Sequence, residues 1–208
     1  MAPPQEWALL IYSLPSQPSR KRAYVWRELK KLGAVYLRDG VAILPRREDV
    51  DRHLQAMVQR IAEYEGTADL ILSPVFRAQR DVEIISQFQE ERAAEYREIY
   101  HACVRFLRDV LHDVDHDDFG FPDVDNLESE LARLRRWHSQ IVERDYFLAP
   151  GNDRVLDILS KCDRAFERFA SEASERTGSA AEEESDDVFE RLGGSGNPVH
   201  AVPEDFPL

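Results

Sequence analysis

The residues best suited to chemistry in this sequence are cations gathered near its N-terminus. Segment 16–47 holds nine lysines and arginines against two acids, a net charge of +7, whereas the rest of the chain sums to −20. Guanidinium and ammonium groups pair with phosphate oxygens, so this local excess indicates a site for a polyanion. The candidate contact residues are Arg20, Lys21, Arg22, Arg27, Lys30, Lys31, Arg38, Arg46 and Arg47.

A helix ending at Leu32 should display most of these cations. Ser16, Pro18 and Ser19 provide the chemistry of a helix start, and Gly33 is a typical C-terminal stop. At about 100° per residue, one stripe carries charge and the opposite stripe is apolar. The basic stripe holds Arg20, Tyr24, Arg27 and Lys31, and the apolar stripe holds Val25, Trp26, Leu29 and Leu32.

Three interpretations of the basic helix stay open. It is a solvated helix face, a surface that contacts DNA phosphates, or a site for a small oxyanion such as chromate, sulfate or phosphate at the helix start, where free N–H groups favour an anion. A helix-turn-helix, zinc finger or basic zipper is not evident in the sequence. The residues themselves therefore support phosphate contact and not base-specific readout.

The elements around this helix predict an α+β fold. Short apolar runs bounded by turn residues indicate strands, and 3.6-residue spacing indicates a second helix after Pro45. Asp39-Gly40 between two of the runs is a hairpin signal. The order strand, helix, strand, strand, helix, strand predicts a ferredoxin-like βαββαβ domain over residues 6–75. The predicted strands are Trp7–Ser13, Val35–Leu37, Val41–Leu44 and Ala68–Ser73.

Helical spacing dominates the next hundred residues, and a three-helix region is predicted over 78–175. An acidic loop is expected over 112–123, followed by a capping box of Asp125 and Glu128. Arg144 and Asp145 are expected to form a structural ion pair. Residues 176–208, rich in Gly, Ser and acids, are predicted to be a disordered acidic tail.

Catalytic and metal sites have little support. His112, Asp115 and His116 offer ligands suited to zinc, but a solvated acidic loop explains them better. Cys103 and Cys162 occupy helical apolar patterns and are predicted to be core residues. The sequence shows no nucleophile elbow or glycine-rich phosphate loop. We therefore expect no enzyme activity, no cofactor and no bound metal.

The composition predicts a cytoplasmic protein. The 208 residues contain no apolar run near the roughly 18–20 residues that span a bilayer, and the start MAPPQEW has no features of a secretory signal. The absence of a close-spaced cysteine motif fits a reducing compartment.

The sequence resembles the N-terminal region of ChrB-type chromate-resistance proteins over most of residues 7–170. The resemblance implies a regulator with chromate-dependent control of a resistance operon, and it implies DNA as partner. Longer members of that family carry a further C-terminal domain. The matching motifs are Ser13-Leu14-Pro15, Val25-Trp26-Arg27, Leu29-Lys30, Leu32-Gly33-Ala34, Leu37-Arg38-Asp39-Gly40-Val41, Leu44-Pro45, and Arg144-Asp145-Tyr146-Phe147 after the helix Leu131–Ile141.

A more distant likeness concerns only the order of elements. It resembles that of small CRISPR-associated endoribonucleases and of the central domain of PaaX-type repressors. The nuclease family holds a metal with an aspartate at the end of its first strand, where this chain has Ser13 or Leu14. A divergent nuclease is therefore the third alternative, after the regulator and the oxyanion-sensing or protein-interaction module. Edge strands in a small sheet also predict a homodimer.

Overall fold

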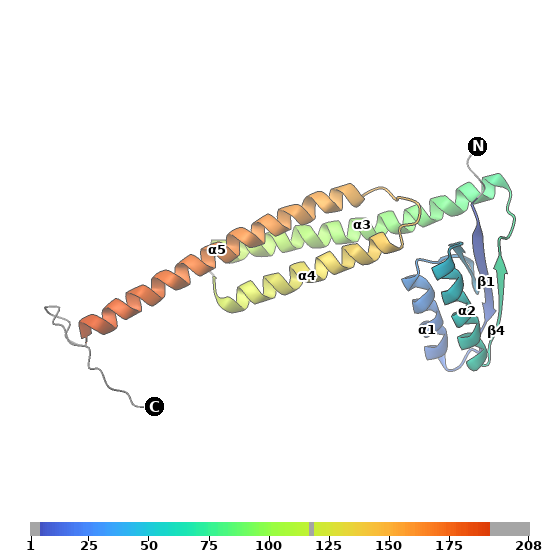
Figure 1. The fold of residues 1–208 in the computed structure, drawn as a ribbon, viewed down its shortest axis with the longest axis horizontal. Helices are drawn as coiled ribbons and strands as arrows, with labels where there is room; N and C mark the ends of the chain where they lie inside the picture. The colour runs from blue at the N-terminus through green and yellow to red at the C-terminus, as the bar shows by residue number, and fades with distance from the viewer. Residues whose placement is uncertain (1–4, 117–118, 192–208) are drawn as a thin grey trace, which may run out of the picture.

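The computed structural model describes residues 5–116 and 119–191 of the chain. It places an antiparallel sheet and two helices at one end of an elongated molecule and three long helices at the other (Figure 1). The predicted α+β class is confirmed. The strands are β1 Trp7–Ser13, β2 Val35–Arg38, β3 Val41–Pro45 and β4 Thr67–Leu72. The helices are α1 Ser19–Lys31, α2 Glu48–Glu63, α3 Ala78–Asp115, α4 Phe121–Glu143 and α5 Asn152–Arg191.

The sheet has the strand order β2-β3-β1-β4, with every neighbouring pair antiparallel. Helices α1 and α2 pack on one face, over a core that includes Leu10, Leu29 and Leu54. The start of α3 packs on the other face, where Phe88 stacks on Trp7. Burial on both faces explains why β1 and β3 are almost continuously apolar.

The turn between β2 and β3 forms as the sequence predicts. Gly40 has φ +70°, a conformation that favours glycine, and a Cβ there would collide with the carbonyl oxygen of Tyr12. The backbone N–H of Tyr12 also donates to the carbonyl of Gly40. The turn is thereby fixed against the end of β1, where the chain leaves the sheet for α1.

Two helix starts differ from the prediction. Pro18 occupies the N-cap of α1 and no described side chain caps the helix, so Ser16 and Ser19, expected to start the helix, do not cap it. Helix α4 begins at Phe121 with Gly120 as its N-cap, so Asp125 and Glu128 lie inside the helix and form no capping box. Pro122, in the first turn, favours this earlier start because its fixed φ suits a helix.

Two predicted non-helical segments are partly helical. Helix α3 runs unbroken through Asp115, into the expected acidic loop. Helix α5 continues to Arg191, so the disorder predicted from residue 176 is not confirmed as far as 191. Alanine and glutamate are strong helix formers, and a packed helix extends without a new nucleation step. Residues 192–208, the rest of the predicted tail, lie outside the described residues.

The three long helices share one apolar core. Cys103 and Phe106 of α3 meet Leu134 of α4 and Cys162 of α5. Both cysteines are buried and free, and the Sγ of Cys162 lies 3.6 Å from the carbonyl oxygen of Cys103. Hydrogen bonding to Cys103 and burial raise the pKa of Cys162, so this thiol stays neutral. The prediction that these thiols are core residues is confirmed.

Candidate nucleic-acid interface

The predicted cations lie at two ends of the sheet. Arg38 borders the turn between β2 and β3, at the end where β1 leads into α1. Arg46 and Arg47 follow β3 and therefore lie at the opposite end. The structure therefore brings the predicted cations of α1 together, with Arg38 near the start of that helix. Arg46 and Arg47 lie apart from this group.

Several of the cations already have carboxylate partners. These ion pairs are mostly exposed, so each contributes little to stability, but each lowers the positive potential available to a ligand. The pairs are Lys21–Glu65 at 3.7 Å, Lys30–Glu91 at 2.7 Å, Lys31–Glu28 at 2.7 Å, Arg46 with Glu6 and Asp51 at 3.1 Å, and Arg47–Asp49 at 3.3 Å.

The other predicted cations, Arg20, Arg22, Arg27 and Arg38, are exposed and form no ion pair with any described residue. Arg27 bonds only within its own helix, where its Nε donates to the carbonyl of Ala23 at 3.2 Å. An unpaired guanidinium can bind phosphate without first releasing a carboxylate. These four residues, three of them on α1, are therefore the strongest candidates for phosphate contact.

The two aromatic residues of α1 differ from the prediction in their exposure to solvent. Tyr24, expected among the charges, is half-buried and its ring packs edge-on against Tyr64 of α2. Trp26, expected in the apolar stripe, has 51% of its surface exposed. The residue before it, Val25, takes the buried position, and a step of about 100° moves the indole to the flank of the helix.

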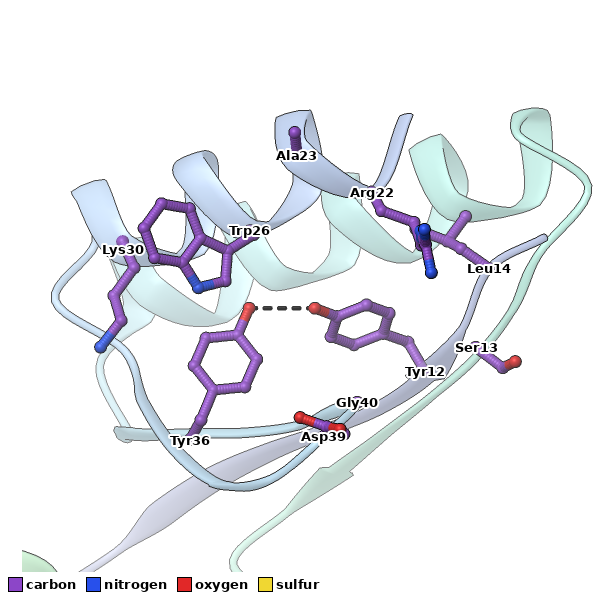
Figure 2. Close-up of a pocket in the computed structure, with 10 residues that line it drawn as sticks. All are labelled: Tyr12, Ser13, Leu14, Arg22, Ala23, Trp26, Lys30, Tyr36, Asp39 and Gly40. Atoms are coloured by element: carbon purple, nitrogen blue, oxygen red, sulfur yellow. Dashed lines mark hydrogen bonds between the residues drawn. The ribbon is translucent and has the colours of Figure 1, made fainter. Parts of the chain in front are cut away.

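Trp26 lies over a cleft of about 760 Å³ between α1 and the sheet (Figure 2). Arg22 and Lys30 lie one turn before and one turn after it on the same flank, and Asp39 lies on the opposite side of the cleft. Such a volume is typical of a small-molecule site. Sequence reasoning missed this cleft, because it assigned the indole to the core.

Two tyrosines from the sheet project into this cleft. The hydroxyls of Tyr12 and Tyr36 lie 2.9 Å apart and share a hydrogen bond. Burial, and secondarily the bond to Tyr12, raise the pKa of Tyr36, so it stays a neutral donor at ordinary pH. Lys30 Nζ lies 5.7 Å from the centre of the Tyr36 ring, a cation–π distance.

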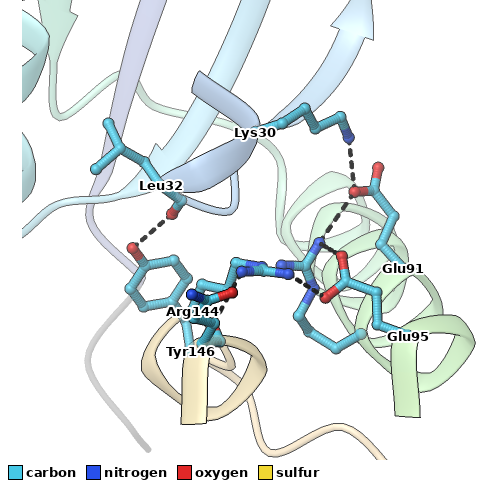
Figure 3. Close-up of polar contacts among 8 residues, drawn as sticks. Lys30, Leu32, Glu91, Glu95, Arg144 and Tyr146 are labelled. Atoms are coloured by element: carbon cyan, nitrogen blue, oxygen red, sulfur yellow. Dashed lines mark hydrogen bonds and ion pairs between the residues drawn. The ribbon is translucent and has the colours of Figure 1, made fainter. Parts of the chain in front are cut away.

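The C-terminal end of α1 is fastened to the long helices. Lys30 bonds to Glu91 of α3, and the hydroxyl of Tyr146 donates to the carbonyl of Leu32 at 2.8 Å (Figure 3). Gly33 adopts φ +79°, and a Cβ at that position would lie 2.8 Å from the Cβ of Arg144. The basic helix is therefore held by close contacts with both α3 and the end of α4.

A buried arginine lies at this junction. Arg92 is 2% exposed, and its Nη2 lies 3.4 Å from Glu91 and 3.2 Å from Glu95. Its Nε and Nη1 are buried without a hydrogen-bond partner among the described residues. Arg144 reaches the other oxygen of Glu95 at 2.7 Å. Buried charges of this kind are tolerated only when paired, so Glu95 is the central residue of the junction.

The expected ion pair between Arg144 and Asp145 does not form. Arg144 turns to Glu95, as above, while Asp145 accepts bonds from the hydroxyl of Tyr96 at 3.0 Å and from the backbone N–H of Ala149. Burial and the nearby Asp145 charge raise the pKa of Tyr96. Asp145 therefore fixes the turn between α4 and α5.

The histidines predicted as possible zinc ligands lie on the last turns of α3. His112 and His116 stack with ring centres 4.0 Å apart, and the Nδ1 of His116 bonds to the carbonyl of His112. Within residues 5–116 and 119–191, no group of three or more side chains is arranged to hold a metal ion. None of the helices in these ranges is both long and apolar enough to cross a membrane.

The family model described as Protein ChrB, N-terminal, matches residues 22–180. The chain belongs to the ChrB N-terminal family. A curated relative, Protein ChrB of Cupriavidus metallidurans, is 30% identical over 142 residues, which cover 68% of this chain and 39% of the relative. The chain thus matches about two fifths of the length of that relative.

The match to the ChrB N-terminal family confirms the predicted resemblance. The match begins inside α1, at Arg22, and extends through β2, β3, α2, β4 and the long helices into α5. Strand β1 precedes it. The matched region therefore includes Trp26 of the cleft and the junction residues Arg92 and Glu95. Arg92 leaves a sign in the sequence, because it interrupts an apolar stripe, and Glu95 follows at the i,i+3 spacing of a helical ion pair. Nothing in the sequence identifies Arg144 as the second partner of Glu95.

Proposed function

We propose that this chain acts in chromate-resistance regulation and contacts DNA phosphates through α1. Membership of the ChrB N-terminal family supports the regulatory role. The observation that carries the DNA contact is the exposed surface of α1, where Arg20, Arg22 and Arg27 have no carboxylate partner among the described residues of a chain of net charge −13. Phosphate contact by these residues would release counterions, so binding would weaken steeply with salt.

The proposed architecture is a ferredoxin-like unit followed by a helical region. The strand order β2-β3-β1-β4, with α1 and α2 on one face, supports the ferredoxin-like assignment. In this arrangement α1 is an outer layer, and its charged face is turned away from the sheet. The sheet supports the helix while leaving the arginines free to meet a duplex.

We further propose that the protein is a cytoplasmic homodimer. Strand β4 is an edge strand, and exposed apolar side chains continue from it towards α3, namely Ile71, Leu72, Val75 and Val82. An exposed apolar edge favours pairing with another chain. Light scattering should give twice the mass of one chain. The substitution Ile71→Lys should give the mass of a single chain, and a monomeric wild type would refute the dimer.

A second candidate is an oxyanion-sensing or interaction module that binds no DNA. The start of α1 has no side-chain cap, and Arg20, Lys21 and Arg22 lie in its first turn. Free N–H groups and nearby cations favour a small anion. Saturable binding of sulfate or chromate without any duplex binding would favour this candidate over the regulator.

Fluorescence anisotropy across a salt series tests the DNA proposal. The probes are the duplex upstream of the protein's own gene and a random duplex, each with and without chromate. Replacing Arg20, Arg27 and Lys31 by alanine should weaken binding and reduce the salt slope by up to about 3. Preference for the upstream duplex that changes with chromate would support regulation.

The matched control removes the same charge elsewhere. Arg105, Arg108 and Arg164 are exposed on the long helices, and their replacement by alanine should leave the affinity and the salt slope unchanged. Equal losses of duplex affinity in both triple variants would show that binding depends on net charge and not on the position of these residues. No binding by the wild type at low salt would refute the DNA contact.

A further inference from the structure

Apart from Arg22, the cleft beside α1 is lined by groups that the phosphate-contact proposal does not use. Trp26 presents half of its surface to solvent above the cleft, although a tryptophan on an amphipathic helix would normally be buried. Small-molecule sites are lined mainly by apolar and aromatic side chains together with a few polar groups, and this cleft has both kinds. The indole therefore offers an aromatic platform for a flat ligand.

The charge around the platform is uneven. Arg22, one helical turn before Trp26, is exposed and has no ion pair among the described residues, whereas Lys30, one turn after it, is held by Glu91 at 2.7 Å. Asp39 faces them across the cleft. The cleft can therefore accept an anionic group at its Arg22 end, and a hydrogen-bond donor beside Asp39.

The tyrosine pair supplies the remaining polar group. Each hydroxyl has one proton, and one of the two protons is used in the bond between Tyr12 and Tyr36. The other proton has no partner among the described residues and can be donated to a ligand. A single donor beneath an aromatic platform suits the edge of a heteroaromatic ring.

A tetrahedral oxyanion does not use this arrangement. It would need one or two cations and backbone N–H groups, and it would leave the indole and most of the 760 Å³ cleft without a function. A base inside an intact duplex is stacked between its neighbours and cannot reach Trp26. The groups match a ligand with a planar ring and a phosphate, separated by a short linker.

We propose that this cleft binds a nucleotide, with the base against Trp26, the phosphate on Arg22 and the tyrosine pair donating to the base. The nucleotide is either free or an unpaired unit of a single strand, since both present the same chemistry. Base–aromatic stacking and a charge-assisted phosphate contact supply the affinity. This site shares Arg22 with the proposed duplex contact, whereas Trp26, Tyr12 and Tyr36 belong to the cleft alone.

Calorimetric titration of the full chain with AMP, adenosine and inorganic phosphate tests the proposal. AMP should bind saturably, and adenosine and phosphate should each bind at least about tenfold more weakly, because each lacks one of the two contacts. Titration with an oligothymidylate of ten nucleotides tests whether the natural ligand is a free nucleotide or part of a single strand. Tighter binding of the oligomer than of AMP assigns the site to single strands, and the reverse assigns it to a free nucleotide.

Variants separate stacking from folding. Trp26→Leu should lose at least about fivefold in AMP affinity, whereas Trp26→Phe keeps a ring and should stay close to wild type. Arg22→Gln should lose about tenfold, and Arg52→Gln, an exposed arginine of α2 outside the cleft, should change nothing. Circular dichroism confirms that each variant is folded.

Duplex binding by the Trp26 variant distinguishes the two proposals. Trp26→Leu should bind duplex as the wild type does, since Trp26 is not among the proposed phosphate contacts. The nucleotide site is refuted if AMP and the oligothymidylate both fail to bind at millimolar concentration, if Trp26→Leu binds AMP as the wild type does, or if phosphate alone binds as well as AMP. A failure of duplex binding alone leaves these results interpretable and refutes only the DNA contact.

Discussion

Arg92 and Glu95, one turn apart on α3, form an ion pair of 3.2 Å where the sheet meets the long helices. Glu95 uses its second oxygen to bind Arg144, so one carboxylate serves two arginines (Figure 3). The nearby Glu91 joins Arg92 to Lys30 of the basic helix. The proposed DNA-contact surface is therefore connected to the helical region through charged side chains, and not only through the chain.

Replacing Glu95 by glutamine should destabilise the protein. The variant keeps the size of the side chain but leaves Arg92 and Arg144 without their shared carboxylate, in a site where Arg92 is shielded from water. We expect a loss of roughly 1–3 kcal/mol, because Glu95 itself is partly exposed. Urea denaturation followed by circular dichroism measures the change.

Glu98→Gln is the matched control for that experiment. Glu98 lies on the same helix, is exposed and has no ion pair among the described residues. Its replacement should shift the free energy of unfolding by less than about 0.5 kcal/mol. If the two variants unfold at the same urea concentration, Glu95 has no special role at the junction.

Replacing Gly33 by alanine tests the close approach of α1 to α4. The φ of +79° is unfavourable for alanine, and its Cβ would lie 2.8 Å from the Cβ of Arg144, so the two elements must move apart. We expect a loss above about 1 kcal/mol from the backbone alone. Thermal unfolding should show it, and an unchanged melting temperature would contradict the contact.

Gly120→Ala provides the comparison for Gly33→Ala. Gly120 does not have a positive φ, and the new Cβ would first meet a carboxylate oxygen of Asp123 at 2.9 Å, at the mobile end of a side chain. The loss should be roughly 0.5–1 kcal/mol, smaller than that of Gly33→Ala, because alanine is a poorer N-cap than glycine but no backbone strain is added. A difference between the two variants therefore isolates the junction.

Stability should fall at alkaline pH because of buried tyrosines. Burial raises the pKa values of Tyr36, Tyr96 and Tyr146 above the ordinary value of 10.0. Above about pH 10 the unfolded chain releases these protons while the folded chain retains them, so the unfolded state binds fewer protons and stability decreases as pH rises. Below pH 10 both states are protonated and these groups cause no pH dependence.

Urea midpoints at pH 8, 9.5 and 10.5 measure this effect. Tyr146→Phe should reduce the fall in the midpoint between pH 9.5 and 10.5, although it also lowers stability at pH 8 by removing the bond to Leu32. Tyr100→Phe, at a partly buried tyrosine of α3, is the control and should keep the wild-type slope. Equal slopes in all three proteins would show that Tyr146 titrates normally in the folded state.

Local patterns in the sequence predicted most of the fold. The apolar runs of β1 and β3, the turn at Gly40 and the helical stop at Gly33 each follow from a few neighbouring residues. The helix starts at Ser19 and Phe121 were less predictable, because several competing start signals lie within a few residues of each. The helix beyond residue 176 was missed because composition was weighed above helix propensity.

The candidate site was less predictable than the fold. The charge excess identified α1, but the partners of Lys30 and Arg46 come from distant segments and depend on tertiary packing. The exposure of Trp26 depends on which flank of the helix meets the sheet, and this is not determined by the helix alone. For a hydrophobic residue at the border of the buried face of a helix, helical periodicity therefore does not decide whether the side chain is buried or exposed.

Removing residues 178–208 tests whether the acidic C-terminal segment affects the basic helix. Segment 182–187 is dense in acids, and as a flexible tail it would compete with DNA, so its removal would tighten binding at low salt. In the structure this segment belongs to α5, which extends away from the sheet towards the far end of the molecule (Figure 1). At 0.1 M salt the Debye length is about 10 Å, so charges at the far end of the molecule act only weakly on α1.

We therefore expect the truncated protein to bind duplex with unchanged affinity in anisotropy titrations at 0.1 M salt. Tighter binding by the truncated protein would show that the acidic segment reaches α1.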